Sequence, residues 1–268
     1  MVCKTTDQRD LYYEVHGNAQ STKTLVFLNG LTQATISWAL VVPFFAAKYR
    51  ILLLDFIFQG QSDKTGNWRD FNQHAADVVS LLDKENIKRA HIVGLSYGSL
   101  VAQHLAVLHP LRVDKLVLVS TFAHKTPYYE AVELAWWRAL ETGGYNLMID
   151  IMLPSVLSEN YFSNPLVPIQ KMKEARKDRS QSAEAIFSLM QATKERKDYR
   201  KDLEQITAAT LIIQGEQDHL LPVHLANEVH LAIKNSKLIV VRNAGHTLNL
   251  EHVPEVCKHI NDFLNKIE

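Results

Sequence analysis

Residues 90–101 read Ala-His-Ile-Val-Gly-Leu-Ser-Tyr-Gly-Ser-Leu-Val, and this stretch decides the fold. An apolar run that ends at Val93 leads into Gly94-Leu95-Ser96-Tyr97-Gly98, and apolar residues at helical spacing follow from Leu100 onward. Small residues on both sides of the serine allow a strand to turn sharply into a helix and hold the hydroxyl exposed above a parallel sheet. The pattern predicts that Ser96 is a nucleophile. In the alternative reading the turn is only structural and Ser96 caps the helix.

A serine hydroxyl needs a base to take its proton and a carboxylate to orient that base. The chain has twelve histidines, of which His246 lies five residues after the end of an apolar run at Val241. Asp218 follows another apolar run, which ends at Ile213. The order serine, aspartate, histidine along the chain is the order expected after this kind of turn. We therefore predict Ser96, Asp218 and His246 as the catalytic residues, with Glu216 as the alternative carboxylate.

Attack of a serine on a carbonyl creates a negative oxygen, which backbone N–H groups stabilise. One donor is expected from Tyr97, the residue after the nucleophile. The second is expected from the turn after the apolar run Thr24–Leu28, where residues 29–32 read Asn-Gly-Leu-Thr. We predict Leu31 as this second donor, although a glycine turn of this kind also occurs for purely structural reasons.

Short apolar runs alternate with helical patterns along most of the chain, which is typical of parallel βαβ units. We expect buried strands at Thr24–Leu28, Arg50–Leu54, Ala90–Val93, Lys115–Val119, Thr210–Ile213 and Lys237–Val241. Leu11–Val15 alternates apolar and polar residues and is expected to be an antiparallel edge strand. The alternation stops for residues 124–203, which we interpret as a helical cap on a core formed by residues 1–123 and 204–268.

The composition is that of a globular protein: 47% of the 268 residues are hydrophobic, and 29 basic side chains balance 29 acidic ones. This balance argues against nucleic acid as a partner. We find no secretory signal and no apolar segment long enough to span a bilayer. The two cysteines, Cys3 and Cys257, cannot complete a zinc site and are interpreted as packing residues of a cytoplasmic protein. No metal is expected.

Four segments together resemble the α/β-hydrolase superfamily with a helical cap. They are the turn at Gly94–Gly98, the Asp218 loop, the stretch from Gly245 to Pro254, and Asp55 followed by Gly60-Gln61-Ser62. The resemblance implies an α/β fold with a mostly parallel central sheet flanked by helices, a helical cap inserted after the sixth strand, and chemistry that needs no cofactor. Hydrolases, lactonases, peroxidases, acyltransferases and hormone receptors share this fold, so the resemblance leaves the substrate open.

Two positions depart from the family pattern. Asn29 stands where a histidine is usual, and Ser99 stands where a second glycine usually follows the turn. With Phe58 and Gly60-Gln61-Ser62, the Asn-Gly turn has a local resemblance to the acyltransferase of rhamnolipid precursor synthesis. The hydroxyl of Ser99 either crowds the packing of the helix on the sheet or faces the site.

We expect a serine hydrolase that cleaves a carboxylic ester or lactone of a small to medium, largely apolar molecule. An acyltransferase with an alcohol or hydroxyacyl acceptor, or a ligand receptor of the same fold, is the alternative. The expected partner is this small molecule, and the oligomeric state is left open. Aromatic side chains and the unusual Asn-Gly turn suggest substrate-binding residues, which we predict to be Asn29, Trp38, Phe58, Trp136 and Trp137.

Overall fold

The computed structural model describes residues 1–177 and 182–266 and contains an eight-stranded sheet with the strand order β1-β2-β4-β3-β5-β6-β7-β8. Strands β1 and β2 are antiparallel to their neighbours, and all other neighbouring strands are parallel. The strands are β1 (Val2–Lys4), β2 (Asp10–Gly17), β3 (Thr24–Leu28), β4 (Arg50–Leu54), β5 (Ala90–Leu95), β6 (Val113–Val119), β7 (Ala209–Gly215) and β8 (Ser236–Val241).

Helices cover both faces of the sheet, and alternate residues of each strand face opposite layers. In β3, for example, Val26 and Leu28 belong to one buried cluster while Leu25 and Phe27 belong to the other. The core helices are α1 (Phe71–Lys84), α2 (Tyr97–Leu108), α8 (Val223–Ala232), α9 (Leu248–Glu251) and α10 (Val253–Leu264), with short 3₁₀ helices at Thr35–Trp38, Val42–Phe44 and Pro110–Arg112. This arrangement is the α/β-hydrolase fold that the resemblance implies.

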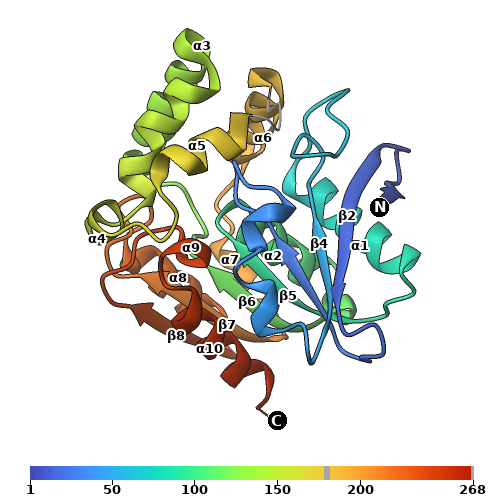
Figure 1. The fold of residues 1–268 in the computed structure, drawn as a ribbon. Helices are drawn as coiled ribbons and strands as arrows, with labels where there is room; N and C mark the ends of the chain where they lie inside the picture. Colours follow the sequence, from blue (N-terminus) through green and yellow to red (C-terminus); the bar gives the residue numbers. More distant parts are fainter. Residues whose placement is uncertain (178–181, 267–268) are drawn as a thin grey trace.

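The insertion after β6 carries further helices and stands over one end of the sheet (Figure 1). They are α3 (Pro127–Val156), which is broken at Gly144, α4 (Glu159–Ser163), α5 (Ile169–Lys177), α6 (Ala183–Glu195) and α7 (Arg200–Leu203). Residues 178–181 of the expected cap and residues 267–268 of the expected core lie outside the described residues. In the described part of the chain, no helix combines the length and apolar character needed to cross a membrane.

The strand predictions need two corrections at the edges of the sheet. Leu11–Val15 lies within β2, which is antiparallel as expected but is not the edge, because β1 pairs with its outer side. With three residues, β1 is too short for its alternation to stand out. At the other edge, β8 was expected to be buried on both faces, yet Val240 is 40% exposed.

Candidate active site

The turn between β5 and α2 presents Ser96 in a conformation that only a constrained chain adopts. Ser96 has φ 52° and ψ −116°, whereas a residue with a Cβ normally avoids positive φ. The turn is held at the Ser96 N–H, which donates to the carbonyl of Val119 at 2.9 Å. A Cβ on Gly98 would collide with the carbonyl oxygen of Leu28, so only glycine allows this helix to start so close to β3.

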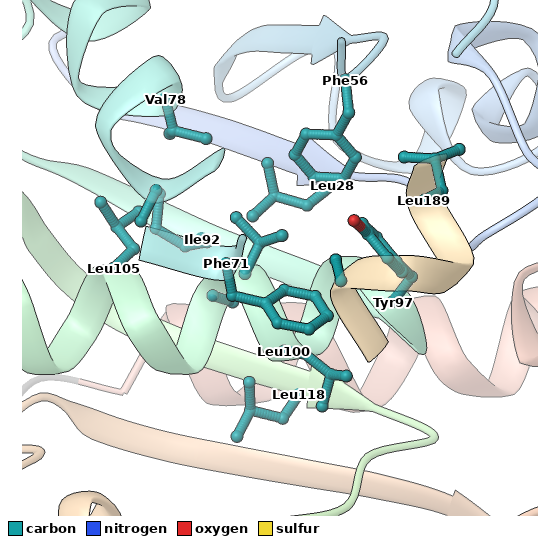
Figure 2. Close-up of a cluster of buried hydrophobic side chains, with 14 of the residues drawn as sticks. Leu28, Phe56, Phe71, Val78, Ile92, Tyr97, Leu100, Leu105, Leu118 and Leu189 are labelled. Atoms are coloured by element: carbon teal, nitrogen blue, oxygen red, sulfur yellow. The ribbon is translucent and has the colours of Figure 1, made fainter. Parts of the chain in front are cut away.

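The side chain of Tyr97, the residue after Ser96, anchors the turn in the apolar core. The ring of Tyr97 points into the core, with its centroid 4.9 Å from that of Phe71 and 5.9 Å from that of Phe56 (Figure 2). Leu189 of the cap helix α6 belongs to the same buried cluster. The backbone of Tyr97 therefore sits between the apolar core and the cavity described below.

His246 and Asp218 meet above the ends of β8 and β7. The Nδ1 atom of His246 lies 2.8 Å from Oδ2 of Asp218, and both side chains are buried. The carboxylate also accepts hydrogen bonds from the Gln214 side chain at 2.7 Å and from the N–H groups of Leu220 and Leu221 at 3.0 and 2.8 Å. Because a carboxylate only accepts, this contact places the imidazole proton on Nδ1 and leaves Nε2 able to act as a base.

The alternative carboxylate lies on the same loop but has a different neighbour. Glu216 accepts a hydrogen bond from the N–H of Asn243 at 3.1 Å. The ring of His246 contacts Asp218 instead. This geometry favours Asp218 as the carboxylate that orients the histidine.

Ser96 and His246 both line one cavity of about 60 Å³ between the sheet and the cap. The described residues that line it include no Asp, Glu, Lys or Arg, and His246 is the one histidine among them. Its apolar wall consists mainly of Leu100, Phe122, Tyr129, Trp136, Met152 and Leu153. A cavity smaller than the roughly 150 Å³ that encloses benzene suits a short or slender apolar group.

A second cavity of about 330 Å³ adjoins the first. The two share Thr32, Gln33, Met172 and Thr247 in their walls. Lys171 is the one Lys, Arg, Asp or Glu residue among the described residues that line the second cavity. The pair of cavities offers an inner compartment next to Ser96 and a larger outer one.

Leu31 and Tyr97, the predicted oxyanion donors, both line the inner cavity. As the first residue of α2, Tyr97 has an N–H without a partner inside its helix. The turn that carries Leu31 is held by the Gln59 side chain, which donates to the carbonyls of Gly30 and Leu31 at 2.9 and 3.1 Å. Gln33 accepts from the Gly30 N–H at 3.1 Å.

Of the predicted substrate-binding residues, the structure brings only Trp136 to the lining of the inner cavity. Asn29 is fully buried beneath the turn, where its Oδ1 accepts from the indole N–H of Trp38 at 2.8 Å. Phe58 is buried in the core, and Trp137 packs against Phe187 in the cap. The four other predicted residues are thus absent from the described linings of both cavities: Asn29, Trp38, Phe58 and Trp137. We reassign Asn29 and Trp38 to positioning the turn.

Comparison with known proteins places the chain in a family. The family described as alpha/beta hydrolase fold matches residues 23–147, and the family described as TAP-like protein matches residues 181–268. The 2-hydroxy-6-oxononadienedioate/2-hydroxy-6-oxononatrienedioate hydrolase 1 of Pseudomonas putida is 30% identical and covers 95% of this chain, with 93% of its own length aligned. The chain belongs to the α/β-hydrolase family.

Two further similarities extend over nearly the whole α/β-hydrolase. A hydrolase of Cupriavidus pinatubonensis with the same substrate name is 28% identical and covers 97% of this chain, with 93% of its own length aligned. The crystal structure of MGS-M2, an α/β-hydrolase enzyme from a Medee basin deep-sea metagenome library, superposes with a TM-score of 0.90 at 26% identity, covering 100% of this chain and 98% of its own. These relatives are hydrolases of the same superfamily.

Two buried glutamines that hold the site in this α/β-hydrolase carry no recognisable signal in the sequence. Gln59 holds the turn that carries Leu31 and Gln214 holds Asp218, but a glutamine next to an apolar run is indistinguishable from a surface residue. Glu251 could have been found from its position in the stretch that carries the family resemblance. In the part of the chain that the structure describes, no group of three or more His, Cys, Asp or Glu side chains could hold a metal ion.

Glu251 clamps the histidine loop on both sides of His246. Its carboxylate accepts from the N–H groups of Gly245 at 3.0 Å and Thr247 at 3.2 Å, and from Ser158 of the cap at 3.1 Å. In Glu251→Gln an amide NH₂ faces at least one of these donors. We expect kcat to fall roughly tenfold, because a small displacement of the base is costly. Steady-state kinetics with an ester substrate measure this.

The matched control for this prediction is Glu255→Gln. Glu255 lies on α10, is half exposed and pairs with two histidines other than His246: His252 at 3.5 Å and His259 at 3.7 Å. Its substitution should leave kcat within about twofold of the wild type, as is usual for a surface residue. Equal losses of kcat in the two variants would show that the clamp has no role.

Proposed function

We propose that this α/β-hydrolase is a serine hydrolase that cleaves a carboxylic ester or lactone of a small to medium, largely apolar substrate through an acyl-enzyme on Ser96. The observation that carries the proposal is the 2.8 Å contact of Asp218 with His246, since His246 lines the same cavity as Ser96. An oriented base in the same cavity as a constrained serine is the arrangement that acyl transfer requires.

In this mechanism the hydroxyl of Ser96 attacks the substrate carbonyl and transfers its proton to Nε2 of His246. Asp218 stabilises the imidazolium through Nδ1, and the N–H groups of Leu31 and Tyr97 donate to the negative oxygen. His246 then protonates the leaving alcohol. Water attacks the acyl-enzyme with His246 as base again, which releases the acid and restores Ser96.

The inner cavity has no Asp, Glu, Lys or Arg among its described lining residues, which favours an uncharged acyl group. The relatives from Pseudomonas putida and Cupriavidus pinatubonensis are named for a dienedioate, a molecule with two carboxylates. Burying a carboxylate without a partner is costly, and the described lining of this inner cavity offers no lysine or arginine to pair with it. We therefore propose a neutral ester or lactone rather than a dienedioate as the substrate.

The outer cavity favours acyl transfer as a second candidate activity. An enzyme that transfers the acyl group to an alcohol or hydroxyacyl acceptor needs space for that acceptor next to the acyl-enzyme. The second cavity of about 330 Å³, which shares part of its wall with the first, supplies such a space. In this candidate the acceptor takes the place of water in the second step.

A time course with p-nitrophenyl esters from acetate to decanoate, run beside a dienedioate of the kind named for the relatives, tests the proposal. We expect sustained turnover, fastest with the shorter esters because the inner cavity is small, and much slower turnover of the dienedioate. A burst that stalls and resumes when an alcohol is added would favour the acyltransferase. Turnover of the dienedioate without any ester cleavage would contradict the proposed substrate class.

A further inference from the structure

The two residues after β6, Ser120 and Thr121, form hydrogen bonds toward both the turn that carries Ser96 and the loop that carries His246. Ser120 and Thr121 are both fully buried, and neither belongs to the described linings of the two cavities. Ser120 has φ 51°, a conformation that a residue with a Cβ rarely adopts. A residue keeps such a strained backbone conformation only where the surrounding structure holds it there. Strained residues of this kind are common at functional sites.

Ser120 holds the histidine loop. Its hydroxyl donates a hydrogen bond to the carbonyl oxygen of His246 at 2.7 Å. The N–H of His246 donates in the other direction, to the carbonyl of Val156 in the cap at 3.2 Å. The peptide groups on both sides of the predicted base are thus fixed, one by the core and one by the cap.

Thr121 reaches the nucleophile through Ser99, the residue that replaces the usual second glycine. The Ser99 hydroxyl lies 2.6 Å from the carbonyl oxygen of Ser96 and 2.9 Å from the hydroxyl oxygen of Thr121. A carbonyl can only accept, and each hydroxyl has one proton to donate. Ser99 therefore donates to Ser96, and Thr121 donates to Ser99.

This series of hydrogen bonds is also fixed at the end away from Ser96. The Gln103 side chain donates to the Thr121 hydroxyl at 2.8 Å and to the carbonyl of Phe122 at 3.1 Å. Arg196, where α6 ends, donates to the Gln103 oxygen at 2.6 Å. Burial lowers the pKa of Arg196 to about 10, so the side chain is charged at neutral pH. Each group in this series of hydrogen bonds donates to the next one toward Ser96. In such an arrangement the hydrogen bonds polarise one another.

We propose that Ser120 and Thr121 are positioning residues that hold the nucleophile elbow and the histidine loop in one fixed relative geometry, Thr121 through Ser99 and Ser120 directly. The inference rests on the proposed function, because it assigns a purpose to the alignment of Ser96 with His246. Since neither side chain lines the cavity, their loss should lower kcat and leave KM nearly unchanged.

Thr121→Val and Ser120→Ala test the inference, since each removes one hydroxyl at nearly constant shape. We expect kcat to fall roughly 10- to 100-fold in both, with KM within about twofold of the wild type. Thr121→Ser retains the hydroxyl and should restore most of kcat. Thr210→Val is the matched control, because Thr210 is equally buried and its hydroxyl donates to the carbonyl of Ala208 at 2.9 Å, at the opposite end of β7 from the site.

Hydrogen exchange of the intact variants supplies a readout that needs no substrate. We expect faster exchange in peptides over residues 94–100 for Thr121→Val and over residues 243–249 for Ser120→Ala, with Thr210→Val leaving both unchanged. If the wild type cleaves no ester but these peptides respond, the positioning role stands and the proposed function fails. Unchanged exchange, or equal loss of kcat in Thr121→Val and Thr210→Val, would overturn the inference.

Discussion

Ser96→Ala is expected to reduce kcat/KM for any ester that the wild-type enzyme cleaves by a factor on the order of 10⁵ to 10⁶. Without the hydroxyl no acyl-enzyme can form, and only the oxyanion donors and the binding cavity continue to favour the reaction. Alanine retains the Cβ at the position where Ser96 has φ 52°, so the turn and the fold should persist. Steady-state kinetics, together with a thermal melt of the same preparation, measure both parts of the expectation.

Ser188→Ala is the matched control for this loss. Ser188 lies on α6 and its hydroxyl donates to the carbonyl of Glu184 at 2.9 Å, on an exposed part of the cap. Its removal should leave kcat/KM within about twofold of the wild type. Residual activity of more than about one part in a hundred in Ser96→Ala, at unchanged melting temperature, would place the nucleophile on another residue.

Asp218→Asn is expected to lower kcat about 10⁴-fold while preserving the shape of the site. The four partners that surround the carboxylate all present N–H groups to it: Gln214, His246, Leu220 and Leu221. An asparagine NH₂ placed toward His246 makes Nδ1 an acceptor and moves the ring proton to Nε2, where it blocks the base. The pH dependence of kcat, measured beside the wild type, reports whether a competent base remains.

Glu216→Gln distinguishes the two carboxylates of this loop. Glu216 contacts the N–H of Asn243, so its substitution should change kcat by no more than about twofold. A loss in Glu216→Gln that exceeds the loss in Asp218→Asn would show that the orienting carboxylate has been assigned to the wrong residue.

The features that could be predicted from the sequence are those with a strong local cause. The strands Thr24–Leu28 and Arg50–Leu54 were predicted with the bounds that the structure shows, because continuous apolar runs and their flanking polar residues mark strands buried on both faces. The turn at Ser96 was also predicted, because Gly94 and Gly98 flank the serine between an apolar run and a helical pattern. Short stretches of the sequence therefore specify these elements.

The walls of the site could not be predicted in the same way. Trp136 and Trp137 are adjacent on α3, and neighbouring helical residues point in directions about 100° apart. One therefore lines the inner cavity while the other packs against Phe187. Asn29 and Trp38 bond to each other below the turn, a pairing that depends on how β3 meets the following loop rather than on any sequence pattern.

The acyl-enzyme on Ser96 can be observed by rapid quenching of the reaction with p-nitrophenyl acetate, followed by intact mass and peptide analysis. We expect a burst of nitrophenol that approaches one equivalent per chain and an added acetyl mass confined to the peptide that contains Ser96. Multiple turnover with no covalent acyl species, or an acyl group on a different residue, would contradict this expectation.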